Sequence, residues 1–168
     1  MKKHVRIIIV LTLLVLSVGC SYSVFMNAFP HLRNVQIATF ENNTSEYALA
    51  QDLQELLVNT FQRDGRLRIT TRDPDSFIDG SILDYRNEIH GYDIFGNISE
   101  YRVTILFSVT FTDMRFNEVI FENTTLRLSE SYSPNADNPE LLTTEKQAQQ
   151  RIFERVFETI IGNTLEAW

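Results

Sequence analysis

The chain of 168 residues contains a single cysteine, Cys20, and three histidines. One cysteine excludes a disulfide framework and a cysteine-rich zinc site within the monomer. His31 and His90 are far apart in the sequence and have no cysteine nearby. Because a metal site usually needs three or four ligands, we expect both histidines to be structural or surface residues.

Signatures of common enzyme classes are also missing. The sequence has no G-x-S-x-G nucleophile elbow, no phosphate-binding loop and no G-x-G-x-x-G motif. It offers no nucleophile–base pair for a hydrolase. Asp73, Asp75 and Asp79 are spaced like calcium ligands, but the loop lacks the required glycine and final glutamate, so a turn is the better interpretation. We expect no enzyme activity, no catalytic residue, no metal and no cofactor.

Residues 1–19 have the pattern of an export signal. A short basic start precedes a twelve-residue apolar stretch, which is too short for a membrane-spanning helix of about 20 residues. Residues 16–20 (LSVGC) resemble a bacterial lipobox, in which Cys20 is acylated and becomes the mature N-terminus. The alternatives are an ordinary export signal with an incidental cysteine and an uncleaved anchor. Ser21 is not the aspartate that favours inner-membrane retention, so we expect an outer-membrane location.

Basic charge is scarce in the chain that follows this signal. Removal of Lys2, Lys3 and Arg6 leaves twelve basic residues against 22 acidic ones, a net charge of −10. Lys146 is then the one lysine, and the other basic residues are arginines. A chain without a basic excess is a poor partner for nucleic acid. An anionic lipid or glycolipid could be held only by a local basic patch together with apolar contacts.

Hydrophobic spacing predicts the element order β-α-β-β-β-β-α. Asn43 and Glu46 fit the start of the first helix, and Gly65 fits its end. The last helix starts at Glu140 or Glu145 and ends at Asn163. Strands are expected at residues 35–40, 66–71, 77–89, 98–112 and 119–132. The third of these is either one long strand or two strands joined by a bend at Gly80.

This order predicts an α+β two-layer sandwich. Two helices cannot cover both faces of a mixed four- to five-stranded sheet, so both are expected on one face. Residues 34–165 would form a single α+β domain, behind the signal at 1–19 and a lipidated tether at 20–33.

Residues 98–112 show the clearest strand pattern. Odd positions from Tyr101 to Phe111 are apolar, and even positions are mostly polar. The even positions form the sheet face opposite the helices: Arg102, Thr104, Leu106, Ser108 and Thr110. Such a weakly charged face suits burial in a wet, polar interface such as a barrel interior. Ser108 is therefore a candidate partner contact, and Phe95 in the preceding loop is a separate candidate.

Arginines cluster on the strand expected after the first helix. Alternation would place Arg66, Arg68 and Arg72 on one face, where they could bind phosphate or carboxylate groups. The alternative is a solvated edge strand whose charges prevent edge-to-edge pairing. Three nearby aspartates would balance this charge: Asp64, Asp73 and Asp75.

Several short motifs, taken in order, resemble one family. The motifs are Gly19-Cys20 with Tyr22, residues 35–44 (VQIATFENNT), 63–69 (RDGRLRI), 79–86 (DGSILDYR) and 99–102 (SEYR) with the long strand after it, and the helix after Asn138-Pro139. Their order and spacing are similar to those of the lipopolysaccharide-assembly (LptE-like) lipoproteins.

That resemblance implies a non-enzymatic outer-membrane lipoprotein. It would plug an LptD-type β-barrel, help to assemble that barrel and help to deliver lipopolysaccharide to the cell surface. Cys20 is the functional residue that carries over, as the lipid attachment to the membrane. Lipopolysaccharide becomes a candidate ligand for Arg66, Arg68 and Arg72.

A second resemblance covers a shorter stretch. A strand that ends in Phe-x-Asn, a helix and the run Gly-Arg-Leu-Arg-Ile are similar to the start of curli-secretion and penicillin-binding-protein-activator lipoproteins. Those proteins form pores or regulate other proteins. The later spacing of Gly80, Tyr85 and residues 100–102 favours the LptE-like family.

Overall fold

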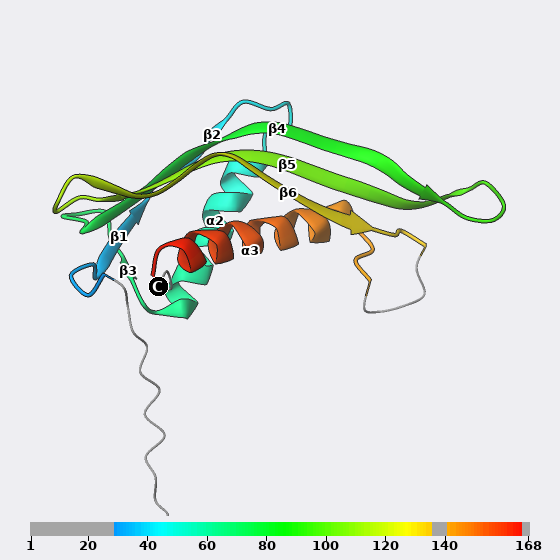
Figure 1. Ribbon diagram of the computed structural model, residues 1–168. Coiled ribbons are helices and arrows are strands. Elements are labelled where there is room, and N and C mark those ends of the chain that lie inside the picture. The colour runs from blue at the N-terminus through cyan, green and yellow to red at the C-terminus, as the bar shows by residue number, and fades with distance from the viewer. Residues whose placement is uncertain (1–28, 136–140, 166–168) are drawn as a thin grey trace, which may run out of the picture.

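A computed structural model describes residues 29–135 and 141–165 of the chain. The elements in these ranges are β1 (Asn34–Ile37), β2 (Glu41–Asn42), α2 (Leu49–Asp64), β3 (Arg68–Ile69), β4 (Ser76–Tyr92), β5 (Ile98–Asp113), β6 (Glu118–Tyr132) and α3 (Glu145–Asn163). The strands form one mixed six-stranded sheet, and both helices lie on the same face of it (Figure 1). The predicted α+β two-layer fold is confirmed, with one strand more than expected.

The strands lie in the order β3-β1-β4-β5-β6, and β2 also pairs with β4. β1 is parallel to both of its neighbours, and α2 makes the crossover that such parallel pairing requires. β4, β5 and β6 then form the predicted antiparallel meander. β4 runs without a break through Gly80, so this segment forms one long strand and not two strands joined by a bend.

The additional strand arises from a bulge in the segment predicted as residues 35–40. Ile37 pairs with Ile78, and Glu41 pairs with Ser81. The segment from β1 to β2 therefore has one residue more than the stretch of β4 between the same two pairs. The ladder is interrupted there, as expected at a bulge. Phe40 lies in the interruption and is buried against the backbone of Gly80.

Helix α2 begins later than predicted. The side chain of Asn42, rather than that of Asn43, accepts a hydrogen bond from the Thr44 N–H, at 3.1 Å, and donates one to the Glu46 carbonyl, at 2.8 Å. These bonds form a turn, and the helix starts after it, at Leu49, without a side-chain cap. The predicted end is confirmed, since Gly65 takes the left-handed conformation (φ 75°) that a residue with a Cβ rarely adopts.

Helix α3 begins at the later of the two predicted positions because Thr144 and Gln147 form a capping box in front of it. Its apolar side and that of α2 pack against the inner face of the sheet. The Phe61 and Phe157 rings meet edge to face between the helices, with centroids 4.8 Å apart. None of the helices in the described ranges has the length and apolarity needed to cross a membrane.

The β4–β5 hairpin extends beyond the layer of helices (Figure 1). Its residues pair across the hairpin as far as Tyr92 and Ile98, whereas β6 leaves the sheet at the Tyr101–Tyr132 pair. The molecule therefore has a thick part, where helices cover the sheet, and a thin two-stranded arm.

Candidate functional site

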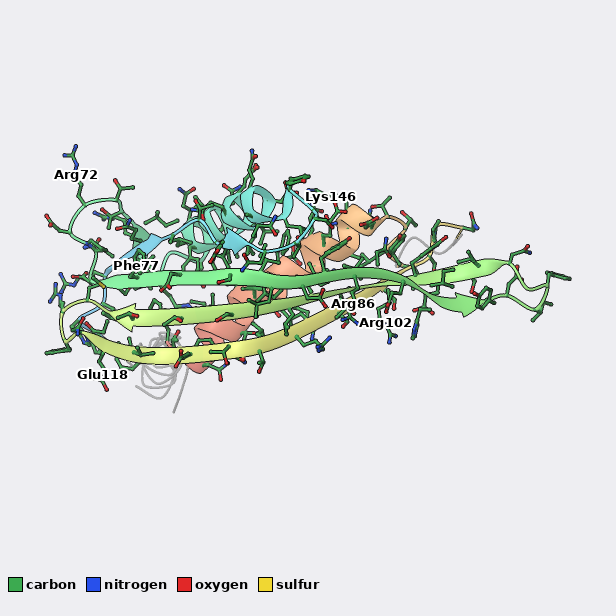
Figure 2. The ribbon with its side chains drawn as sticks, turned by 90° about the horizontal axis from the view of Figure 1, so that it is seen from above. Arg72, Phe77, Arg86, Arg102, Glu118 and Lys146 are labelled. Carbon is green, nitrogen blue, oxygen red and sulfur yellow. The ribbon has the colours of Figure 1, made fainter. Side chains whose placement is uncertain are left out.

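The outer face of the sheet is built by the even positions of β5. Burial alternates along this strand as predicted: Val103, Ile105, Phe107, Val109 and Phe111 are buried against the helices. The four positions Thr104, Leu106, Ser108 and Thr110 are half-buried on the other side, and Arg102 is exposed. Figure 2 looks onto this outer face, from which Arg86 and Arg102 project.

Flanking strands add a mixed set of polar groups to this face. Between β5 and β6, the Thr104 and Ser129 hydroxyls lie 3.0 Å apart, and the Arg102 side chain donates to the Ser131 hydroxyl at 3.3 Å. Arg86 pairs with Asp84 at 2.9 Å on the β4 side. The β5 row from Thr104 to Thr110 is thus uncharged, and charged residues flank it on both neighbouring strands: Asp79 and Glu122 pair with Thr110, and Asp84 and Arg127 pair with Leu106.

Ser108 occupies the middle of this face. It pairs across β4 with Ser81, another short hydroxyl side chain. On β6 the register shifts between the partners of Phe107 and Val109, beside Ser108. Short hydroxyl side chains on neighbouring strands therefore meet at this point of the face, and a polar partner could form hydrogen bonds with them.

Phe95 is displayed at the tip of the arm, where its side chain is 82% exposed. The loop that carries it is ordered by Asp93, whose carboxylate accepts from the N–H groups of Phe95, at 2.8 Å, and Asn97, at 2.9 Å. The Asn97 side chain also donates to this carboxylate, and these bonds hold the pKa of Asp93 below its ordinary value. Gly96 closes the turn at φ 85°.

The arginine cluster differs from its prediction, because β3 is limited to Arg68 and Ile69. Arg66 precedes the strand and turns back to Asp64, with guanidinium–carboxylate distances of 3.0 Å. Arg72 follows in a turn that the Thr70 hydroxyl stabilises by exchanging hydrogen bonds with the Arg72 backbone. The three arginines therefore do not form one strand face; Arg68 and Arg72 are exposed and Arg66 is half-buried.

A buried pair of aspartates lies at the end of the sheet where the described chain begins. Asp75 accepts from the Arg33 N–H at 3.0 Å, the Asn34 N–H at 2.9 Å and the Arg115 guanidinium at 2.7 Å. Asp113 accepts from the backbone N–H groups of Arg115 and Phe116 and is paired with His31. This cluster joins the start of the domain to the β3–β4 loop and to the β5–β6 turn.

These contacts keep both carboxylates ionised. Burial alone would raise the pKa of Asp75, but the Arg33 N–H, the Arg115 side chain and the Asn34 N–H together hold it below its ordinary value. Burial alone would likewise raise the pKa of Asp113. The contact with His31, together with hydrogen bonds from two backbone N–H groups, holds it below its ordinary value.

Sequence reasoning missed this cluster. The sequence predicts that Asp75 balances the arginines at 66–72, whereas in the structure it pairs with Arg115. Asp113 begins a turn, and an aspartate at that position is a local turn signal. No local signal connects it to His31, which lies 82 residues away in the chain. His90 is exposed on the arm. Cys20, the predicted lipid attachment, lies outside the described residues.

Two solved structures share this two-layer α+β fold. The hypothetical protein CT253 from Chlamydia trachomatis is 11% identical, with 79% of this chain and 97% of that chain covered and a TM-score of 0.55. Protein XCC0632 from Xanthomonas campestris is 11% identical over 83% of this chain and 88% of its own, with a TM-score of 0.54. The fold therefore belongs to a known class of α+β domains.

A family model is more specific than these structures. The lipopolysaccharide-assembly model, LptE, matches residues 32–162. The match covers both helices, all the strands of the sheet and the outer face described above. Among curated proteins, none matches the chain. The chain belongs to the LptE family of lipopolysaccharide-assembly proteins, and the resemblance inferred from its motifs is confirmed.

Proposed function

We propose that this chain is an outer-membrane lipoprotein that is anchored through acylated Cys20 and plugs an LptD-type β-barrel. There it assists the assembly of the barrel and the transport of lipopolysaccharide to the cell surface. Membership of the LptE family supports a role in lipopolysaccharide assembly. The lipobox-like residues 16–20 support the anchor, and Ser21 supports the outer membrane as its location.

The outer sheet face is the observation that carries the proposed partnership. From Thr104 to Thr110 its central row has no charge, although the chain after residue 19 carries a net charge of −10. A protein that met only water on this face would gain solubility from charge there. Hydroxyl groups such as Ser108, Thr104 and Ser129 instead suit a wet interface with a polar barrel lumen.

The arginines have a less direct place in this proposal. Guanidinium groups form bidentate hydrogen bonds with phosphates, so Arg68 and Arg72 have the chemistry needed to bind the phosphate groups of lipopolysaccharide. Arg66 already binds Asp64, and a phosphate would have to compete with that carboxylate. Contact between this subunit and lipopolysaccharide remains a prediction.

Site-specific photo-crosslinking in cells tests the partnership. A photoreactive residue at Ser108 should capture one large outer-membrane β-barrel protein. Comparison probes at Arg68 and at Phe95 report partner contacts at the sheet edge and at the tip of the arm, respectively. Crosslinks from these two positions with none from Ser108 would move the interface away from the sheet face. Capture of a partner that is not a barrel would contradict the plug function itself.

A further inference from the structure

Exposed apolar side chains gather at the β5–β6 turn. Phe116 is 69% exposed, Val119 52% and Met114 48%. We call this end of the sheet the entry end, and define it as residues 29–33, the β3–β4 loop at residues 70–75 and residues 113–119. Figure 1 shows the start of the described chain and the β5–β6 turn at the same end of the sheet, opposite the arm. Figure 2 places Arg72 and Glu118 there as well.

Direct contacts hold the parts of the entry end together. The Met114 N–H donates to the Asp75 carbonyl at 2.8 Å. The ring of His31 packs edge to face against Phe116, with centroids 5.1 Å apart, and against Phe29, at 6.1 Å. The apolar turn is therefore fixed to the segment that arrives from Cys20.

The length of that segment limits how far the entry end can be from an acylated cysteine. Eight residues separate Cys20 from Phe29. At no more than about 3.6 Å for each residue, the two positions cannot be farther apart than about 32 Å. The 17-residue strand β4 alone measures roughly 55 Å at about 3.3 Å per residue. The entry end is thus the part of the fold that the anchor keeps near the membrane.

The surface charge of the entry end differs from that of the whole chain. Three arginines lie here: Arg33, Arg72 and Arg115. Of the four acidic groups at this end, Asp75 and Asp113 are buried beneath their hydrogen-bond donors. The exposed acids are Asp73 and Glu118. Arg115 is paired with Asp75, and Arg33 and Arg72 supply two further exposed guanidinium groups, which can bind phosphate, within a chain that is otherwise acidic.

We propose that the entry end rests on the lipid bilayer. Met114, Phe116 and Val119 insert among the headgroups, and Arg33 and Arg72 contact lipid phosphates. An apolar cluster beside cationic side chains is the composition of an interfacial membrane contact. This inference depends on the proposed acylation of Cys20, and it adds a second membrane contact, made by the folded domain, to the lipid anchor.

Fluorescence quenching on vesicles tests the contact. The acylated full-length protein would carry an environment-sensitive label at Glu118→Cys or, as the matched control, at Ile94→Cys on the arm. It would be placed on vesicles of phosphatidylethanolamine and phosphatidylglycerol without any barrel protein. Interfacial side chains lie about 5–10 Å into the headgroup–acyl boundary. Nitroxide lipids labelled near the headgroup should therefore quench position 118 several-fold more strongly than position 94.

A variant separates insertion from simple proximity. Met114→Ser with Phe116→Ser should reduce quenching at position 118 to the level of position 94. Ile89→Ser, an equally polar change on the arm, should leave the quenching unchanged. Because Phe116 contacts His31, the thermal midpoint of the double variant is measured as well. Unchanged quenching in a folded double variant would contradict the inference.

Three further outcomes are distinguishable. A wild-type protein that floats with the vesicles but shows equal quenching at both positions would overturn the membrane contact and leave the anchor intact. A protein that neither floats nor incorporates a palmitate analogue would overturn the proposed acylation of Cys20. A label at position 118 that stays unquenched on vesicles, while a photoreactive residue at Phe116 crosslinks to the barrel in cells, would assign the patch to the protein partner instead.

Discussion

Replacement of Phe107 by alanine should strongly destabilise the domain. Phe107 is 0% exposed and lies opposite Ile82 on β4 and Leu126 on β6, whose side chains share its face. Its ring also meets Phe153 of α3 edge to face, with centroids 6.5 Å apart. The residue therefore joins three strands and a helix. Truncation of a buried phenylalanine lowers the free energy of unfolding by about 3–5 kcal/mol, against a total of about 5–15 kcal/mol.

Leu106→Ala is the matched control for this prediction. Leu106 is the preceding residue of the same strand, but it is half-buried on the outer face. The loss of a half-buried leucine side chain should cost about 1 kcal/mol. Urea denaturation followed by circular dichroism measures both changes. A larger loss for Leu106→Ala than for Phe107→Ala would mean that the two faces of β5 have been assigned in reverse, and the outer-face argument would then fail.

Two further predictions concern packing and pH. Gly80→Ala should lower the free energy of unfolding by about 1–3 kcal/mol, because its Cβ would clash with the Ser108 carbonyl oxygen and the Phe40 ring; Gly162→Ala in α3, where nothing lies within 4 Å, should be neutral or stabilising in the same urea titration. The pKa values of Asp75 and Asp113 are lowered by folding, so the stability that they contribute is present above the ordinary value of 3.8 and is lost as the pH falls through the lower folded values. Urea midpoints should therefore decrease below about pH 4, and Asp75→Asn should weaken this dependence while reducing stability at neutral pH; an equally steep acid dependence in that variant would show that other groups cause it.

The parts of the fold that were predictable are those with a local physical cause. The alternation along β5 follows from the two-residue period of a strand with one buried face. Gly65 was recognisable as a helix end because few other residues adopt its backbone conformation. Both predictions are confirmed by the structure, since neither depends on residues elsewhere in the chain.

The parts that differ depend on distant partners. Phe40 leaves the ladder because Gly80, forty residues later, offers a place to bury its ring. α2 starts at Leu49 because the amide of Asn42 forms a turn with the backbone of Thr44 and Glu46, which follow it. The candidate contacts Ser108 and Phe95 could be placed from alternation and turn residues, whereas the pairing of Asp75 with Arg115 required the fold.

The two-stranded arm also has a consequence for hydrogen exchange. Its last support from β6 is the pair Tyr101–Tyr132, whose rings stack with centroids 5.3 Å apart. Beyond that pair the amide groups of β4 and β5 are protected only by each other, and an isolated hairpin is marginally stable in water. Amide protons should therefore exchange progressively faster from Val103 toward Phe95. Such a gradient gives the protein a rigid base and a tip that can adjust its shape to a partner, so the two ends of one hairpin would differ in how much of their structure is fixed before they bind.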